Sequence, residues 1–111
     1  MGRFSFNSHV RVDVEDRPLA HLQIVMGNKL RRGESFFFTW REDPSVGDGR
    51  RAVWIHPAAD LDFKYFGSRA PHINRMWLEK LAQLANGTTG LYLVSEPPED
   101  GQASVTTMDV I

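Results

Sequence analysis

Residues 16–40, DRPLAHLQIVMGNKLRRGESFFFTW, constrain the fold more than any other stretch, because they combine a helix, a helix stop and an aromatic strand. Asp16 and Pro18 suit the first turn of a helix, and Gly33 suits a left-handed end. The apolar stripe at helical spacing consists of Leu19, Leu22, Met26 and Leu30. The alternation in residues 34–40 predicts a strand with Phe36, Phe38 and Trp40 on one face.

Apolar and polar residues also alternate in segments 4–6, 10–14, 51–56 and 61–66, and a shorter apolar segment spans 90–95. Each of these patterns predicts a strand. A second helical stripe predicts a helix over about residues 71–86. Because the links between strands are short, we expect an α+β fold in the order ββ-α-βββ-α-β. It would be a two-layer sandwich with a mainly antiparallel sheet of about six strands and two helices on one face.

The chain has 111 residues, which is enough for one domain. We expect a single α+β domain over residues 1–95. From Glu96 the sequence EPPEDGQAS is acidic, contains proline and has no apolar periodicity. Residues 96–111 are therefore predicted to form a mobile acidic tail.

Composition excludes several classes of protein. The chain has no cysteine, which excludes a disulfide scaffold and a thiolate site and fits a reducing cytoplasm. No apolar run approaches the roughly 18 residues of a membrane span, and the first residues lack the apolar stretch of a signal peptide. We therefore expect a cytoplasmic protein that makes no contact with a membrane.

The net charge of −1 is distributed unevenly along the chain. All 13 lysines and arginines lie at or before Lys80, whereas four of the 14 acidic residues lie in residues 95–111. Residues 1–94 thus hold 13 basic and 10 acidic residues, a net charge of +3. This charge permits contact with DNA or another polyanion, although a dedicated DNA-binding domain is usually much more basic.

Basic side chains at the ends of the predicted elements could contact a phosphate backbone, beside an exposed aromatic ring that stacks on bases. The candidate nucleic-acid- or anion-binding residues are Lys29, Arg31, Arg32, Arg51, Trp54, Arg69 and Arg75. Alternatively, these charges complement helix dipoles and solvate loops. The alternation places Phe37, Trp54, His56 and Phe66 on the outer face of the sheet, where an uncovered aromatic patch would mark a binding surface or a dimer interface.

Other motifs give little chemistry. The loop around Gly47 and Gly49 lacks the P-loop pattern and is better explained as a hairpin turn. The start of the second helix, with Arg69 and Arg75, could bind an anion, unless Asn74 satisfies a neighbouring backbone group there. The four histidines show no spacing typical of metal ligands. We therefore expect no catalytic residue, no metal site and no cofactor.

Four segments resemble a family of small actinobacterial proteins built on a domain of unknown function. The segments are LAHLQIVMGNKLRRGESFFFTW, GDGRRAVWIHP, SRAPHINRMWLEKLA and GLYLVSEPPE, and the resemblance covers about residues 1–98. Members of that family often carry the label "ATP-dependent DNA ligase". The resemblance implies an association with DNA metabolism and assigns no catalytic or binding residue.

Ligase activity itself does not fit the sequence. An ATP-dependent ligase forms its adenylated intermediate on a lysine within a K-x-D-G motif. After Lys64 the glycine is in place, but Phe66 stands where that motif has aspartate. The sequence thus favours a small non-catalytic binding module, an accessory nucleic-acid-binding protein in DNA metabolism. The alternative is a homodimeric protein-interaction or structural domain that does not bind nucleic acid.

Overall fold

A computed structural model describes residues 2–42, 45, 47 and 49–99, and within them five strands and two helices. The elements are β1 (Gly2–Phe6), β2 (Val10–Val14), α1 (Asp16–Arg31), β3 (Phe36–Arg41), β4 (Arg50–Ile55), β5 (Leu61–Lys64) and α2 (Arg75–Ala85). The predicted α+β class with antiparallel strands and two helices is confirmed. The strands form two sheets, however, in the orders β2-β1-β5 and β3-β4.

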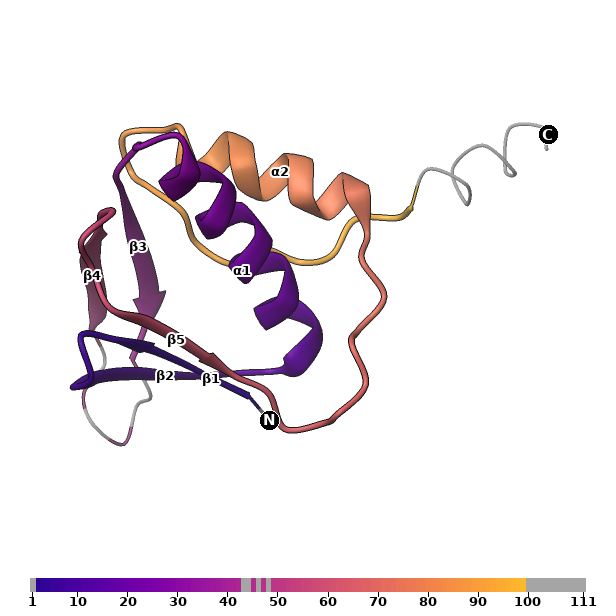
Figure 1. Ribbon diagram of the computed structural model, residues 1–111, viewed down its shortest axis with the longest axis horizontal. Helices are drawn as coiled ribbons and strands as arrows, with labels where there is room; N and C mark the ends of the chain where they lie inside the picture. The colour runs from indigo at the N-terminus through magenta and orange to yellow at the C-terminus, as the bar shows by residue number, and fades with distance from the viewer. Residues whose placement is uncertain (1, 43–44, 46, 48, 100–111) are drawn as a thin grey trace, which may run out of the picture.

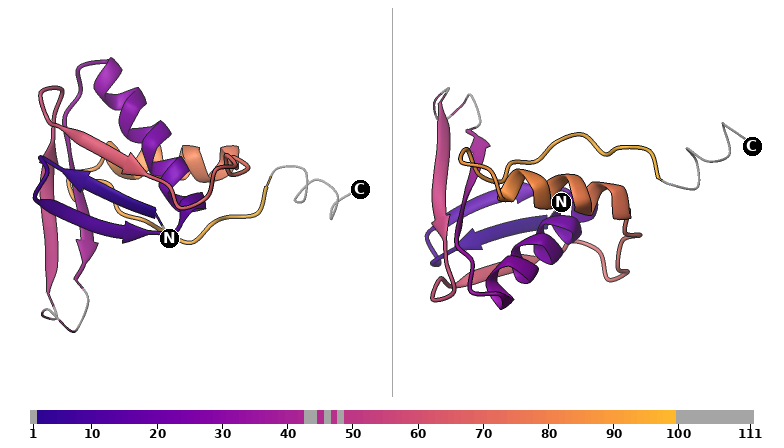
Figure 2. Two further views of the ribbon diagram at one scale, coloured as in Figure 1. Left: turned by 60° about the horizontal axis from the view of Figure 1, so that its bottom comes forward. Right: turned by 90° about the horizontal axis from the view of Figure 1, so that it is seen from above.

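The two sheets and the two helices enclose one core. In Figure 1 the sheet β2-β1-β5 lies along the bottom, β3 and β4 stand at the left, and both helices lie in the angle between them. Figure 2 shows the same arrangement from two other sides. The sheets meet where the rings of Phe4 and Phe38 pack edge to face, with 5.4 Å between ring centroids. Leu19, Leu22 and Met26 of α1 are fully buried against this junction, as their spacing predicts.

Helix α1 starts at the residue predicted to be its cap, one residue earlier than expected. Glu15 is the N-cap, and Asp16 is the first helical residue. The Asp16 carboxylate instead accepts hydrogen bonds from the backbone N–H groups of Phe66 (3.0 Å) and Gly67 (2.8 Å). These two bonds lower the pKa of Asp16. The prediction that Asp16 caps its own helix is therefore wrong, because the side chain anchors a distant loop.

The predicted strand over residues 90–95 is reduced to one parallel bridge between Leu91 and Phe38. Leu91 donates its N–H to the Phe37 carbonyl (2.8 Å) and accepts from the Thr39 N–H (2.9 Å). Residues 90–99, which we call the C-terminal strap, then run without regular structure past the helices (Figure 1). The described strap contacts the domain as far as Glu99. Most of the predicted mobile tail, residues 100–111, lies outside the described residues.

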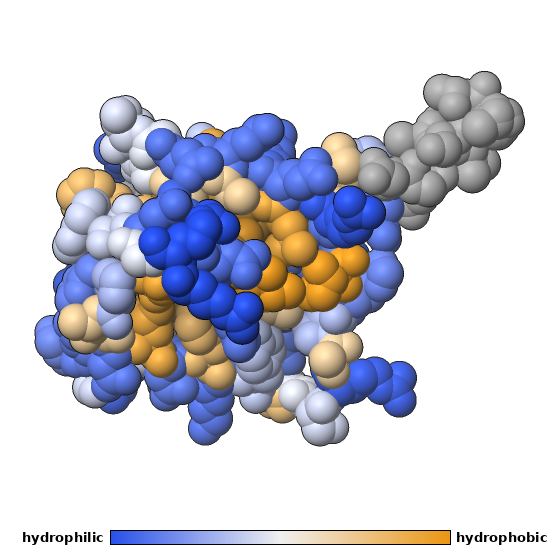
Figure 3. Space-filling model, turned by 45° about the horizontal axis from the view of Figure 1, so that its top comes forward, coloured by the Kyte–Doolittle hydropathy of each residue, from blue (hydrophilic) through white to orange (hydrophobic). Residues whose placement is uncertain are grey.

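Helix α2 begins at Arg75, four residues after the predicted start at Pro71. Asn74 is still extended, with φ −99° and ψ 110°, and its side chain caps the helix. On the face shown in Figure 3, apolar surface emerges between hydrophilic side chains over the helix pair. Neither helix in the described part of the chain is long and apolar enough to cross a lipid bilayer.

Candidate functional site

The outer surface of the β3-β4 hairpin carries two exposed aromatic rings. Phe37 and Trp54 are cross-strand partners, with 44% and 49% of their surfaces exposed. Their ring centroids lie 4.9 Å apart at an interplanar angle of 63°. Their neighbours Phe36 and Ile55 are buried, because successive side chains on a strand point to opposite faces. The sequence-based placement of Phe37 and Trp54 on the outer face is therefore confirmed. His56 and Phe66, predicted on the same face, instead follow the ends of β4 and β5 and belong to neither strand.

The C-terminal strap lies against β3 and carries a further exposed ring. Leu91 is fully buried in its bridge to Phe38, and the next residue, Tyr92, is 40% exposed. Before it, Gly90 packs directly on the backbone of Phe37. We call Phe37 and Trp54 the aromatic face. An exposed aromatic group of this kind on a small domain marks a surface for contact with a ligand or another protein.

Arginines occur at both ends of the hairpin. Arg41 and Arg50 form the last cross-strand pair, and the strand register places them on the side of Trp54. Arg51 pairs with Trp40, so it lies on the opposite side of the hairpin from Trp54. Arg31 and Arg32 are exposed at the end of α1, shortly before β3 begins.

Lys29 and Glu34 form a compact ion-pair group near that end of α1. The Lys29 side chain is buried, donates to Asn86 Oδ1 and lies 3.0 Å from a carboxylate oxygen of Glu34. Arg32 pairs with the other carboxylate oxygen of Glu34 at 3.2 Å. Hydrogen bonds from Arg32 and, to a smaller extent, from Lys29 lower the pKa of Glu34. Lys29 thus has an evident structural role in joining α1 to the residue that follows α2.

The structure divides the predicted basic residues into two groups. Arg31, Arg32 and Arg51 lie on or near the β3-β4 hairpin. Arg75 is the first residue of α2 and is exposed, and Arg69 is exposed in the link that leads to this helix. Figure 1 places the start of α2 at the far side of the molecule from that hairpin. The two groups therefore do not form one continuous basic surface with Trp54.

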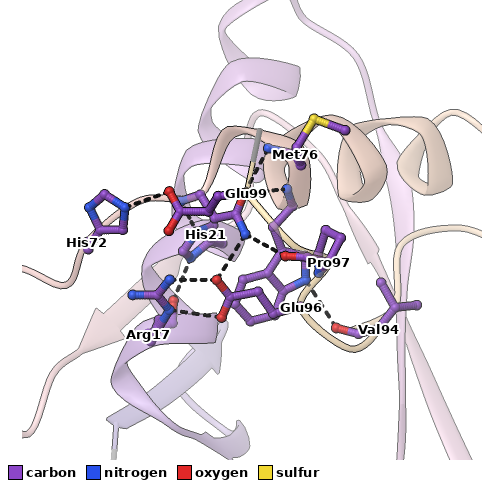
Figure 4. A network of polar contacts seen from close by, with 10 residues as sticks. Arg17, His21, His72, Met76, Val94, Glu96, Pro97 and Glu99 are labelled. Atoms are coloured by element: carbon purple, nitrogen blue, oxygen red, sulfur yellow. Dashed lines mark hydrogen bonds and ion pairs between the residues drawn. The ribbon is translucent and has the colours of Figure 1, made fainter. Parts of the chain in front are cut away.

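A second polar site lies where α2 begins (Figure 4). Asn74 is fully buried, and its Oδ1 accepts hydrogen bonds from the N–H groups of Met76 (3.0 Å) and Trp77 (3.4 Å). Its Nδ2 donates to Glu96 Oε2 (3.0 Å) and to the Pro97 carbonyl (2.8 Å). One side chain therefore caps α2 and holds the C-terminal strap, and the predicted alternative that Asn74 satisfies neighbouring backbone groups is confirmed.

His21 of α1 completes this site from the other side. Its Nδ1 lies 2.7 Å from the Arg17 carbonyl, and its Nε2 accepts the backbone N–H of Asn74 at 2.9 Å. A carbonyl only accepts and a backbone N–H only donates, so Nδ1 is the donor and Nε2 is the acceptor. The ring also packs on Trp77, with 4.5 Å between ring centroids. Both ring nitrogens have partners, which leaves neither available as a general base.

Glu96 supplies the negative charge at the start of α2. Arg17 donates from Nε (3.0 Å) and from a terminal nitrogen to the two carboxylate oxygens of Glu96, as Figure 4 shows. These bonds, with the one from Asn74, lower the pKa of Glu96 to about 2. Farther along the strap, His72 Nε2 lies 2.9 Å from Glu99. We call Arg17, His21, Asn74 and Glu96 the polar clamp.

The polar clamp occupies the start of the second helix, which the sequence indicated as a possible anion-binding site. A helix N-terminus attracts negative charge, and here the chain's own Glu96 carboxylate lies beside it. Sequence reasoning missed Glu96 because it falls in the acidic segment that was predicted to be mobile. Trp77 also donates its indole N–H to the Val94 carbonyl (3.1 Å), so the strap is held at a further point. Among the described residues, no three histidine, aspartate or glutamate side chains gather as metal ligands.

Glu96 should make the free energy of unfolding fall as the pH is lowered. Its pKa is below the ordinary 4.5 in the folded protein, so its contribution is complete above about pH 4.5 and is lost as pH falls toward about 2. We expect the variant E96Q to be less stable than the wild type at pH 7 and to lose less stability between these two pH values. Urea unfolding at a series of pH values measures both effects, and parallel pH profiles for the two proteins would contradict the assignment.

Comparison with known families gives one match. The model of a domain of unknown function, DUF7882, matches residues 1–96, which contain the seven helices and strands of the described residues and the glutamate of the polar clamp. Comparisons with curated proteins and with solved structures found no match. The family match covers far more than half of the chain, and the protein therefore belongs to the DUF7882 family of domains of unknown function.

Proposed function

We propose that the protein is a small non-catalytic module that binds single-stranded nucleic acid on its aromatic face, as a cytoplasmic accessory protein in DNA metabolism. The observation that carries the proposal is the pair of half-exposed rings, Phe37 and Trp54, on an outer sheet surface. Proteins that bind single strands stack bases on such rings and follow the backbone with arginine or lysine. The ligase label of the family it resembles is consistent with a role beside DNA, and the sequence argues against catalysis.

The surroundings of the rings suit a base. The next cross-strand pair on the outer surface is Thr39 and Ala52, whose short side chains leave room beside Trp54. Beyond them, Arg41 and Arg50 lie on the same side, and strand geometry puts the Cα atoms of Arg50 and Trp54 about 13 Å apart. Arg31 and Arg32 lie toward the opposite end of β3. A strand running along the hairpin would therefore have cations near both ends of its stacking surface.

The expected result is weak, salt-dependent binding that depends on Trp54. Each base stacked on an aromatic ring contributes about 1–3 kcal/mol, so W54A should weaken binding of a labelled oligothymidine by about 5- to 150-fold. Replacing Arg50 with alanine should remove one phosphate contact and so reduce the slope of log affinity against log salt concentration by about 1. Fluorescence anisotropy at low salt, repeated at several salt concentrations, measures both effects.

Phe66 offers a matched control for these measurements. Its side chain is 82% exposed, but it lies in the loop after β5 and outside the aromatic face. F66A removes an exposed aromatic ring of similar size and should leave the affinity unchanged. Equal losses in F66A and W54A would place the contact elsewhere or make it non-specific. Absence of measurable binding to any single strand at low salt would refute the proposed function.

A further inference from the structure

We propose that two copies of this chain associate through the outer edge of β2, each strand pairing antiparallel with itself across a two-fold axis centred on Val12. The sheet order β2-β1-β5 makes β2 an edge strand. This interface is separate from the aromatic face, so it does not depend on the proposed function. Its basis is the order of charges along residues 9–15, HVRVDVE.

The backbone directions leave the required hydrogen-bonding groups on the open edge. Asn7 donates its N–H to the Asp60 carbonyl (2.8 Å), so its backbone N–H and C=O groups point toward β5. These groups alternate in direction along a strand, so those of Phe4 and Phe6 point the other way, toward β2. Val12 is the register partner of Phe4 and therefore points toward β1. The backbone groups of Arg11 and Asp13 consequently point outward, and no described strand pairs with them.

The side chains on this edge complement each other when two copies pair antiparallel. With Val12 opposite Val12 of a second copy, Arg11 of each copy lies opposite Asp13 of the other. One step farther out, His9 lies opposite Glu15. His9 and Arg11 precede Asp13 and Glu15 along the strand, so an antiparallel pair places each basic residue opposite an acidic one, whereas a parallel pair places like residues together. Asp13 would then lie between Arg11 of the second copy and Arg3 of its own chain, which it contacts at 3.1 Å. Charged edge strands usually prevent association, but this order of signs favours it in one register.

The inner side of the same strand fits the second copy as well. Val12 is half-buried on the edge, while Phe4 beside it is fully buried. In the paired arrangement Val12 would be covered by Val12 of the second copy, and the three-stranded sheets would join into one of six strands. The opposite edge strand, β5, is a poorer candidate for self-pairing. Pairing centred on Phe63 would place only one kind of charged pair, Asp62 with Lys64, in register, and β5 has four residues whereas β2 has five.

Two single charge reversals test the register directly. In R11D both outward residues are acidic, and in D13R both are basic, so each variant alone has like charges opposite each other in the dimer. When R11D and D13R are mixed, every acid again lies opposite a base. Sedimentation velocity from about 10 µM to about 1 mM should show a concentration-dependent dimer for the wild type, monomers for each variant alone, and a dimer for the mixture.

Cysteine cross-linking identifies the edge independently. The natural sequence has no cysteine, so any disulfide in a single-cysteine variant joins two molecules. The two Val12 residues would form a non-hydrogen-bonded pair with Cα atoms about 4.5 Å apart, close enough for a disulfide. V12C should therefore cross-link at least tenfold faster than H9C, although His9 is more exposed. Equal rates, or a faster H9C, would place the contact elsewhere.

Three outcomes would overturn the proposal. The first is a wild-type protein that remains monomeric up to about 1 mM. The second is a mixture of R11D and D13R that does not associate although both variants are folded by circular dichroism. The third is a dimer that W54A abolishes and V12C does not cross-link, which would assign self-association to the aromatic face. If W54A loses oligonucleotide binding and still dimerises, both proposals stand independently.

Discussion

Replacing Asn74 with alanine is expected to lower the free energy of unfolding by about 3 kcal/mol. Loss of an N-cap costs about 1 kcal/mol. The same substitution leaves the Pro97 carbonyl without the hydrogen bond that Asn74 donates and removes one of the bonds to Glu96. Each buried polar group left without a partner costs about 1–3 kcal/mol. Urea unfolding measures this loss, and an unchanged dependence on urea concentration would show that the folded state remains compact.

The variant N74D separates helix capping from the rest of the polar clamp. Aspartate caps a helix about as well as asparagine, so capping alone predicts little change. The clamp predicts the opposite, because an aspartate carboxylate cannot donate to Pro97 and would face the Glu96 carboxylate, which now lies 3.0 Å from the Asn74 amide nitrogen. We expect N74D to be at least as destabilised as N74A at pH 7. A value within about 0.5 kcal/mol of the wild type would mean that only the cap matters.

The helices and hairpins were predictable because their signals are local. The α1 stripe of Leu19, Leu22 and Met26 is buried as its spacing predicts, and strict alternation placed Phe37 and Trp54 outside. Division into two sheets was not predictable, since β5 pairs with β1, more than fifty residues earlier, and not with its neighbour β4. Contacts between distant strands leave no periodic trace in the sequence. The packing of Phe63 on Phe4, with 5.2 Å between ring centroids, is such a contact.

The polar clamp was not predictable for a related reason. Its charged partners, Arg17 and Glu96, are 79 residues apart, and composition alone assigns Glu96 to an acidic, proline-containing tail. Only Asn74 gave a signal, as a polar residue within an apolar helical sector. That signal correctly indicated a satisfied buried group, and three-dimensional packing then determined which groups satisfy it.

Gly90 should be the least replaceable of the glycines with a left-handed backbone. Its φ is +86°, and a Cβ atom there would lie 2.6 Å from the Phe37 carbonyl oxygen and 2.7 Å from the Phe37 Cβ. Alanine therefore adds the left-handed strain of about 1–2 kcal/mol to a collision with backbone that cannot move aside alone. We expect G90A to lose about 3 kcal/mol of stability in urea unfolding.

Gly33 provides the matched comparison, because its φ is +73° and a Cβ atom there would meet nothing within 4 Å. G33A should cost only the backbone strain, about 1 kcal/mol. The difference between the two variants then isolates the close approach of the C-terminal strap to β3. In G90A the strap must move from β3, so hydrogen exchange should become faster at the Leu91 and Thr39 amides, which bond across this contact. Equal losses in G90A and G33A, with unchanged exchange at these amides, would show that the strap does not pack on Phe37 in solution.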